Sequence, residues 1–116
     1  MQAKDPNYGT SSSILKGTID VVQRQHLRTV VLIILREIYP KAVSIPVLQD
    51  SLNGRGLEVG TIPLFAEVIY LEEKHLVRVE SPVTWKKATV RIAARGIDYL
   101  EGSIQEVGLA SPDLYQ

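Results

Sequence analysis

The residues best suited to chemistry in this chain are cations in its C-terminal third. The segment 81–97 contains no Asp or Glu, and it carries four basic side chains: Lys86, Lys87, Arg91 and Arg95. Lys and Arg bind phosphate oxygens, so this segment predicts contact with the backbone or the minor groove of DNA. Trp85 precedes the two lysines and is included in the predicted DNA contact, although its ring fits packing over a hairpin better than stacking on a base. A solvated basic surface is the alternative interpretation.

The segment 61–71 contrasts with this one, because it reads as a helix with few polar side chains. Leu64, Val68 and Leu71 recur at helical spacing and are expected to face the core. The opposite face would then be formed by Ile62, Pro63, Phe65, Ala66, Ile69 and Tyr70. Base edges are read by polar side chains, and only Thr61 and Tyr70 can form hydrogen bonds here.

Three interpretations of this face stay open. It could meet the major groove through Thr61, Phe65 and Tyr70, with weak sequence specificity. An exposed apolar stripe fits a protein interface better. The anchors of that interface would be Ile62, Phe65, Ile69 and Tyr70. The chain's own N-terminal segment, or a dimer mate, could also cover the face.

Catalysis and metal binding have little support in the sequence. The two histidines, His26 and His75, lie in different predicted elements, and no Ser-His-Asp pattern joins them. Glu72 and Glu73 are adjacent, so they point to different sides of a helix and read as a solvated face. There is no dense cluster of metal ligands and no Gly-Lys-Ser/Thr phosphate loop. We therefore expect neither an enzyme nor a cofactor.

Composition bounds the class of protein further. The 116 residues include 13 basic and 13 acidic side chains, so the net charge is zero, which is unusual for a nucleic-acid-binding domain unless the charge is locally concentrated. The absence of cysteine excludes disulfides and is compatible with a reducing compartment. The longest apolar run, 30–35, is far shorter than the ~20 residues that span a bilayer. A cytoplasmic location without membrane contact is the expectation.

The order of the predicted elements indicates a fold. A helix over 23–39 is stopped by Pro40, and its apolar residues cover most of its sides, which predicts burial in the core or against a second subunit. Ser44 and Thr61 are predicted N-caps of two further helices. Two strands with period two, a loop between them, and a short helix follow in residues 77–80, 81–87, 88–92 and 94–102. This order predicts a winged helix-turn-helix, an α+β fold that is mainly helical.

The predicted domain covers residues 14–102. Residues 1–13 are mostly polar and include three serines, and they read as a flexible N-terminal tail. Residues 103–116 contain a few apolar residues and Pro112, and they read as a C-terminal tail. Arg24 and Arg28 add positive charge near the start of the first long helix.

Two family resemblances can be read from these motifs. The stretches "YLEEKHLVRVES" and "VRIAARGIDYLEG" resemble winged-helix transcription regulators of the MarR and ArsR type, over about residues 27–102. The longer stretch "LQDSLNGRGLEVGTIPLFAEVIYLEEKHLV", with Trp85, "RGIDYLEG" and "VGLASP", resembles a small family of winged-helix proteins encoded by Mu-like prophages. The chain departs from the usual pattern at His75, where glycine is common, and at Ala93, where a capping Thr or Ser is common.

The resemblances imply a function and partners. They imply binding of double-stranded DNA by a regulator or accessory factor of phage origin, acting in the cytoplasm of a bacterial host. A homodimer is expected, and a phage or host protein is a further possible partner. The rival hypothesis is a winged helix that serves as a protein-interaction module through its apolar third helix.

Overall fold

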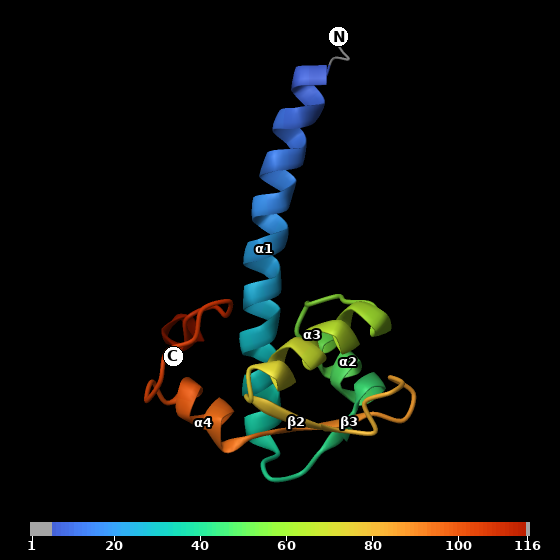
Figure 1. Cartoon of the computed structure of the whole chain (residues 1–116), viewed down its shortest axis with the longest axis vertical. Helices are drawn as coiled ribbons and strands as arrows, with labels where there is room; N and C mark the ends of the chain where they lie inside the picture. The colour runs from blue at the N-terminus through green and yellow to red at the C-terminus, as the bar shows by residue number, and fades with distance from the viewer. Residues whose placement is uncertain (1–5, 116) are drawn as a thin grey trace.

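The computed structural model describes the backbone of residues 6–115 and the side chains from residue 20 onward. This part of the chain is an α+β structure, mainly helical. Its elements are α1 (Pro6–Glu37), β1 (Val43–Ser44), α2 (Ile45–Gly54), α3 (Thr61–Glu73), β2 (Val77–Glu80), β3 (Thr89–Ile92), α4 (Ala94–Leu100) and a 3-10 turn, η1 (Pro112–Tyr115). Figure 1 shows α1 running into the body, with α2 and α3 on one side and α4 on the other, while its N-terminal half projects beyond them.

Helix α1 begins at Pro6, well before the predicted start at Gln23. Proline suits the first helical position, and a glycine inside a helix costs about 1 kcal/mol without ending it. Residues 6–13, predicted as a flexible tail, therefore belong to α1, while residues 1–5 lie outside the described part. The helix ends at Glu37, within one turn of Pro40, which the sequence predicts as its stop.

Residues 103–115, here called the C-terminal segment, pack back onto α1 instead of forming the predicted tail (Figure 1). The Ala110 N–H donates to the carbonyl of Gln25 at 3.0 Å. The Ala110 carbonyl accepts two hydrogen bonds, from the hydroxyls of Thr29 and Tyr99, each at 2.7 Å. The backbone of Ala110 is therefore satisfied by groups of α1 and α4.

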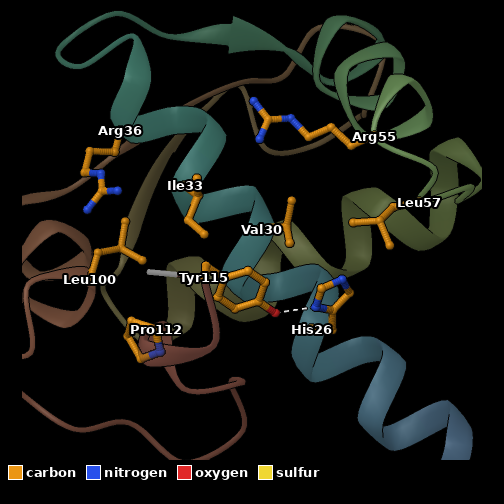
Figure 2. Close-up of a pocket in the computed structure, with 9 residues that line it drawn as sticks. All are labelled: His26, Val30, Ile33, Arg36, Arg55, Leu57, Leu100, Pro112 and Tyr115. Carbon is orange, nitrogen blue, oxygen red and sulfur yellow. Dashed lines mark hydrogen bonds between the residues drawn. The ribbon is translucent and has the colours of Figure 1, made fainter.

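The end of the C-terminal segment is held by an aromatic pair. The hydroxyl of Tyr115 forms a hydrogen bond with Nδ1 of His26, and the two rings stack with their centroids 5.3 Å apart (Figure 2). Leu109 is 8% exposed and joins the core. One apolar anchor and several directed polar contacts thus fix a segment whose sequence looks like a loop.

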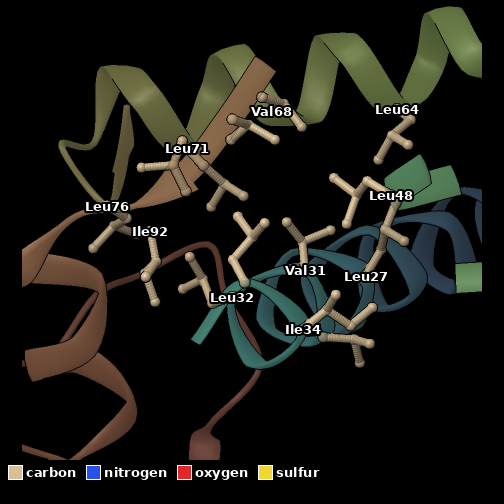
Figure 3. Close-up of a cluster of buried hydrophobic side chains, with 14 of the residues drawn as sticks. Leu27, Val31, Leu32, Ile34, Leu48, Leu64, Val68, Leu71, Leu76 and Ile92 are labelled. Atoms are coloured by element: carbon tan, nitrogen blue, oxygen red, sulfur yellow. The ribbon is translucent and has the colours of Figure 1, made fainter. Parts of the chain in front are cut away.

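The C-terminal half of α1 is apolar on most sides because the rest of the chain surrounds it. Val31, Leu32 and Leu35 have no solvent exposure, and α1 contacts α2, α3, α4 and β3. Burial within the chain accounts for this composition without a second subunit. The predicted inner face of α3 is confirmed, since three of its side chains are fully buried against this helix (Figure 3): Leu64, Val68 and Leu71.

One of the two predicted helix caps is present. Ser44 is the N-cap of α2, and its hydroxyl accepts a hydrogen bond from the N–H of Val47 at 3.4 Å. The prediction for Thr61 is wrong, because Gly60 is the N-cap of α3 and Thr61 is the first helical residue. Its hydroxyl donates instead to the amide oxygen of Gln49 at 2.9 Å, which ties α3 to α2.

The sheet has three antiparallel strands in the order β1-β3-β2, whereas the sequence predicts two. Strand β1 has two residues, too few to show a period, and its Val43 pairs with Val90 of β3. The predicted hairpin is present, with Val77 opposite Ile92. The outer edge of β2 is partly satisfied, because the N–H of Val79 donates to a carboxylate oxygen of Glu72 at 3.1 Å. Glu72 therefore accepts a hydrogen bond from the backbone of β2, whereas the sequence predicts a solvated side chain.

The turn from α3 to β2 explains how the chain tolerates His75. Its φ of 64° is left-handed, the conformation in which glycine is usual. The His75 N–H donates to the backbone carbonyl of Glu72 at 2.8 Å, and the Leu76 N–H donates to the backbone carbonyl of Leu71 at 3.0 Å. This pair of hydrogen bonds is the pattern of a Schellman motif. Two hydrogen bonds that close the helix offset a conformational cost of roughly 1–2 kcal/mol.

Candidate nucleic-acid interface

Four basic side chains lie on the β2–β3 hairpin and its loop, here called the hairpin cations: Arg78, Lys86, Lys87 and Arg91. Arg78 on β2 and Arg91 on β3 are direct cross-strand partners. Partners in a ladder point to the same face, and here that face is opposite to the buried Val77, Val90 and Ile92. The register therefore places the two arginine side chains on the same outer face of the sheet, at directly opposite positions.

This cross-strand pair costs stability in the free protein. Like charges directly opposite one another in a sheet are destabilising. Among residues 20–115, the ion pairs within 4.0 Å involve other cations, and none involves a hairpin cation. Glu80 lies on the same face, two residues beyond Arg78. Because no hairpin cation pairs with Glu80 or with another carboxylate of residues 20–115 within 4.0 Å, the positive charge of the hairpin stays available to an anion from outside the chain.

The loop of the hairpin adds the two lysines. Lys86 and Lys87 are exposed, and the ammonium of Lys86 lies 5.9 Å from the centroid of the Trp85 ring. Trp85 is partly buried and packs against the hydrophobic core, as expected for an aromatic that closes a hairpin rather than one that stacks on a base. Val83, in the same loop, is 94% exposed.

Arg95 does not join the hairpin cations. Its guanidinium donates to the carbonyl of Lys74 at 2.7 Å and pairs with the carboxylate of Glu106 at 2.5 Å. Lys74 binds the same carboxylate at 3.1 Å. Glu106 belongs to the C-terminal segment, and no pattern in the sequence predicts an acid beside Arg95. A role for Arg95 in binding phosphate stays a prediction, and its charge is already matched within the chain.

The two cations also change the acidity of Glu106. Desolvation by burial raises the pKa of this carboxyl, but hydrogen bonds from Arg95 and Lys74 outweigh it and hold the pKa below the ordinary value of 4.5. Because the pKa is lower in the folded protein, the ionised carboxylate contributes stability above pH 4.5. That contribution is lost as the pH falls through the folded pKa.

Glu106→Gln should therefore be less stable than the native protein at neutral pH. The gap between the two free energies of unfolding should narrow below pH 4.5. Urea unfolding at several pH values measures this gap. Glu101→Gln, at an exposed carboxyl outside the four ion pairs of the described residues, is the matched control and should not reproduce the narrowing. A gap that is constant with pH would contradict the assigned role of Glu106.

The outer face of α3 is only partly open. Ile62 is 67% exposed, whereas Phe65, Ile69 and Tyr70 are partly buried. The guanidinium of Arg28 lies 3.7 Å above the Tyr70 ring, and the C-terminal segment passes over the Tyr70 hydroxyl at Gly108. The chain itself covers Tyr70, but the C-terminal segment does so rather than the N-terminal segment that the sequence suggests as one alternative.

Arg28 is likewise held inside the protein. Its Nε donates to the carboxylate of Glu67 at 2.6 Å, and its Nη1 donates to the carbonyl of Gly108 at 2.8 Å. The side chains of Arg28 and Glu67 are 13% and 14% exposed. Arg28 therefore links α1, α3 and the C-terminal segment. From the sequence, Arg28 was expected only to add positive charge near the start of the first long helix. Arg24 is exposed.

One of the hairpin cations, Arg78, is not among the DNA-contacting residues predicted from the sequence. The signal was present, because Arg78 alternates with Val77 and Val79 in the same way that Arg91 alternates with Val90 and Ile92. A hairpin register that aligns the two alternations brings the arginines together. The lysines and Arg91 were found because they lie in a run without acids, and Arg78 lies outside that run.

Comparisons with known proteins assign no class to the chain: no family model, curated protein or solved structure matches it. Among the described residues, no three His, Cys, Asp or Glu side chains gather closely enough to hold a metal ion. None of the described helices combines the length and the apolar character needed to cross a membrane.

Proposed function

We propose that this chain is a winged-helix protein that binds double-stranded DNA through its β2–β3 hairpin, as a regulator or accessory factor of the phage type. The single observation that carries the proposal is the cross-strand pair of Arg78 and Arg91, which has no carboxylate of residues 20–115 within 4.0 Å. A DNA backbone supplies the missing negative charge, and the exposed Lys86 and Lys87 extend the same contact.

The proposed mode of binding follows from the residue types. Cations that contact phosphate position a protein on DNA without reading its sequence. Helix α3, which would enter the groove in a winged helix, offers few polar groups, and the hydroxyl of Thr61 already bonds to Gln49. We therefore expect weak sequence preference and strong dependence on salt.

Replacing the cross-strand pair tests this mode. Arg78→Gln with Arg91→Gln should weaken binding to a labelled random duplex at least about tenfold at low salt, because two charge-assisted contacts are lost. Fluorescence anisotropy measures the change. Lys41→Gln with Arg55→Gln removes the same net charge from exposed positions outside the hairpin and should change the affinity much less. Equal losses in the two double variants would remove the hairpin from the proposal.

A second candidate function is favoured by Ile62. This side chain is 67% exposed at the start of α3, where a base-reading helix would present a polar group. Ile62 would anchor a protein partner or the mate in a homodimer, and Phe65 and Ile69 would form the edge of that contact. If the hairpin variants bind duplex as the native protein does, and Ile62→Asp converts a sedimenting dimer to a monomer, the interaction module replaces DNA binding as the function.

A further inference from the structure

A cavity of about 480 Å³ lies between α1, the α2–α3 connection and the C-terminal segment (Figure 2). Its size falls in the range of sites that hold small organic molecules. Three parts of the chain that are distant in sequence form its walls. It is separate from the hairpin, because none of the hairpin cations lines it.

The floor of this cavity is apolar. Val30 and Ile33 of α1 line its centre, with Leu57 on one side and Leu100 of α4 on the other (Figure 2). The ring of Tyr115, stacked on His26, forms a further wall. A molecule seated here would exchange water for aliphatic and aromatic surface, so the site selects a ligand with an apolar body.

The rim of the cavity is cationic. Arg36 and Arg55 both line it, and no Asp or Glu of the described residues does. Arg55 pairs with Glu37 at 3.0 Å, but both side chains are about half exposed, so that ion pair is screened and weak. Arg36 also borders an adjoining cavity that includes Glu101 and Asp113. Guanidinium groups recognise carboxylate, sulfonate and phosphate oxygens through paired hydrogen bonds.

From this arrangement we infer that the cavity is a binding site for an amphipathic organic anion. The apolar body would lie on Val30 and Ile33, and the anionic group would meet Arg36 and Arg55. Because Tyr115 belongs to the C-terminal segment, the bound molecule would contact that segment and α1 at the same time. This site does not depend on the proposed function, since it shares no residue with the hairpin cations.

The experiment uses the fluorescent sulfonate 1-anilinonaphthalene-8-sulfonate as the probe, with the full chain. Saturable binding with a Kd of about 10–100 µM is expected for a ligand of this size. Arg36→Gln with Arg55→Gln should weaken binding at least about tenfold, through lost charge-assisted hydrogen bonds. Ile33→Trp, which places a larger side chain in the cavity, should abolish binding. Both arginines are exposed, so the double variant is expected to keep the fold, and circular dichroism checks this.

Two controls separate the outcomes. The uncharged analogue N-phenyl-1-naphthylamine should bind the native protein more weakly than the sulfonate does, and the arginine double variant should bind it as the native protein does. Arg78→Gln with Arg91→Gln should leave sulfonate binding unchanged. The inference is overturned if the native protein shows no saturable binding, if the arginine double variant binds the sulfonate with native affinity, or if only the hairpin variant loses it.

Discussion

Ending the chain at Gly102 should lower its free energy of unfolding by roughly 3–5 kcal/mol, from the apolar burial lost and the buried groups left without partners. Leu109 would no longer cover the core, and the buried hydroxyl of Tyr99 would lose its acceptor at Ala110. Arg28 would lose one of its hydrogen-bond acceptors, the Gly108 carbonyl. A loss of this size is a large part of the stability of a small domain, which is about 5–15 kcal/mol.

Urea unfolding followed by circular dichroism measures the effect of this truncation. Val107→Ala, at a side chain that is 81% exposed within the same segment, is the control and should change the stability by less than about 0.5 kcal/mol. A truncated chain that is as stable as the full chain would mean that residues 103–115 are the loose tail that their composition suggests.

Gly96→Ala is expected to destabilise the protein by about 2–3 kcal/mol, the cost of overpacking a close contact. A Cβ at this position would overlap the backbone carbonyl oxygen of Leu76 and would lie 2.7 Å from Cγ1 of Ile92. That carbonyl accepts a hydrogen bond from the N–H of Ala93, which is the N-cap of α4 and has no side-chain cap. Because backbone cannot move aside as a flexible side chain can, α4 would have to shift away from the sheet.

The control for this substitution has the opposite expected sign. Gly54 is the last residue of α2, and a Cβ there would meet nothing within 4 Å. Gly54→Ala should leave stability unchanged or raise it by up to about 1 kcal/mol, since alanine is the better helix former. The midpoint of thermal unfolding, measured for both variants, tests these two expected changes in stability. Equal midpoints for Gly96→Ala and the native protein would show that α4 does not pack closely on Leu76.

Elements with a sustained period could be predicted from the sequence. The spacing of Leu64, Val68 and Leu71 placed the inner face of α3 correctly, and the alternation around Val77 and Val90 located the hairpin. Strand β1 has no period to detect, because two residues suffice for its ladder with β3. The cap of α3 was misplaced because Thr61 forms its hydrogen bond across to α2 rather than along its own helix.

The candidate site could be predicted only where charge was locally unopposed. Lys86, Lys87 and Arg91 stood out because no acid lies near them in sequence. Arg95 and Tyr70 look equally available in sequence, yet Glu106 and Gly108 meet them in the structure. Both partners come from the C-terminal segment, whose cited contacts with α1 join residues 80 and 81 positions apart. Local patterns carry no information about pairings of that range.

The most direct test of DNA binding through the hairpin is the salt dependence of duplex affinity, measured by fluorescence anisotropy from low to physiological salt. Four hairpin cations that each displace a counterion predict a slope of about −3.6 in log K against log salt concentration. The Arg78→Gln with Arg91→Gln variant should reduce the slope to about −1.8, since two contacts remain. No binding at low salt, or a slope that this variant leaves unchanged, would contradict the proposal that the hairpin holds DNA.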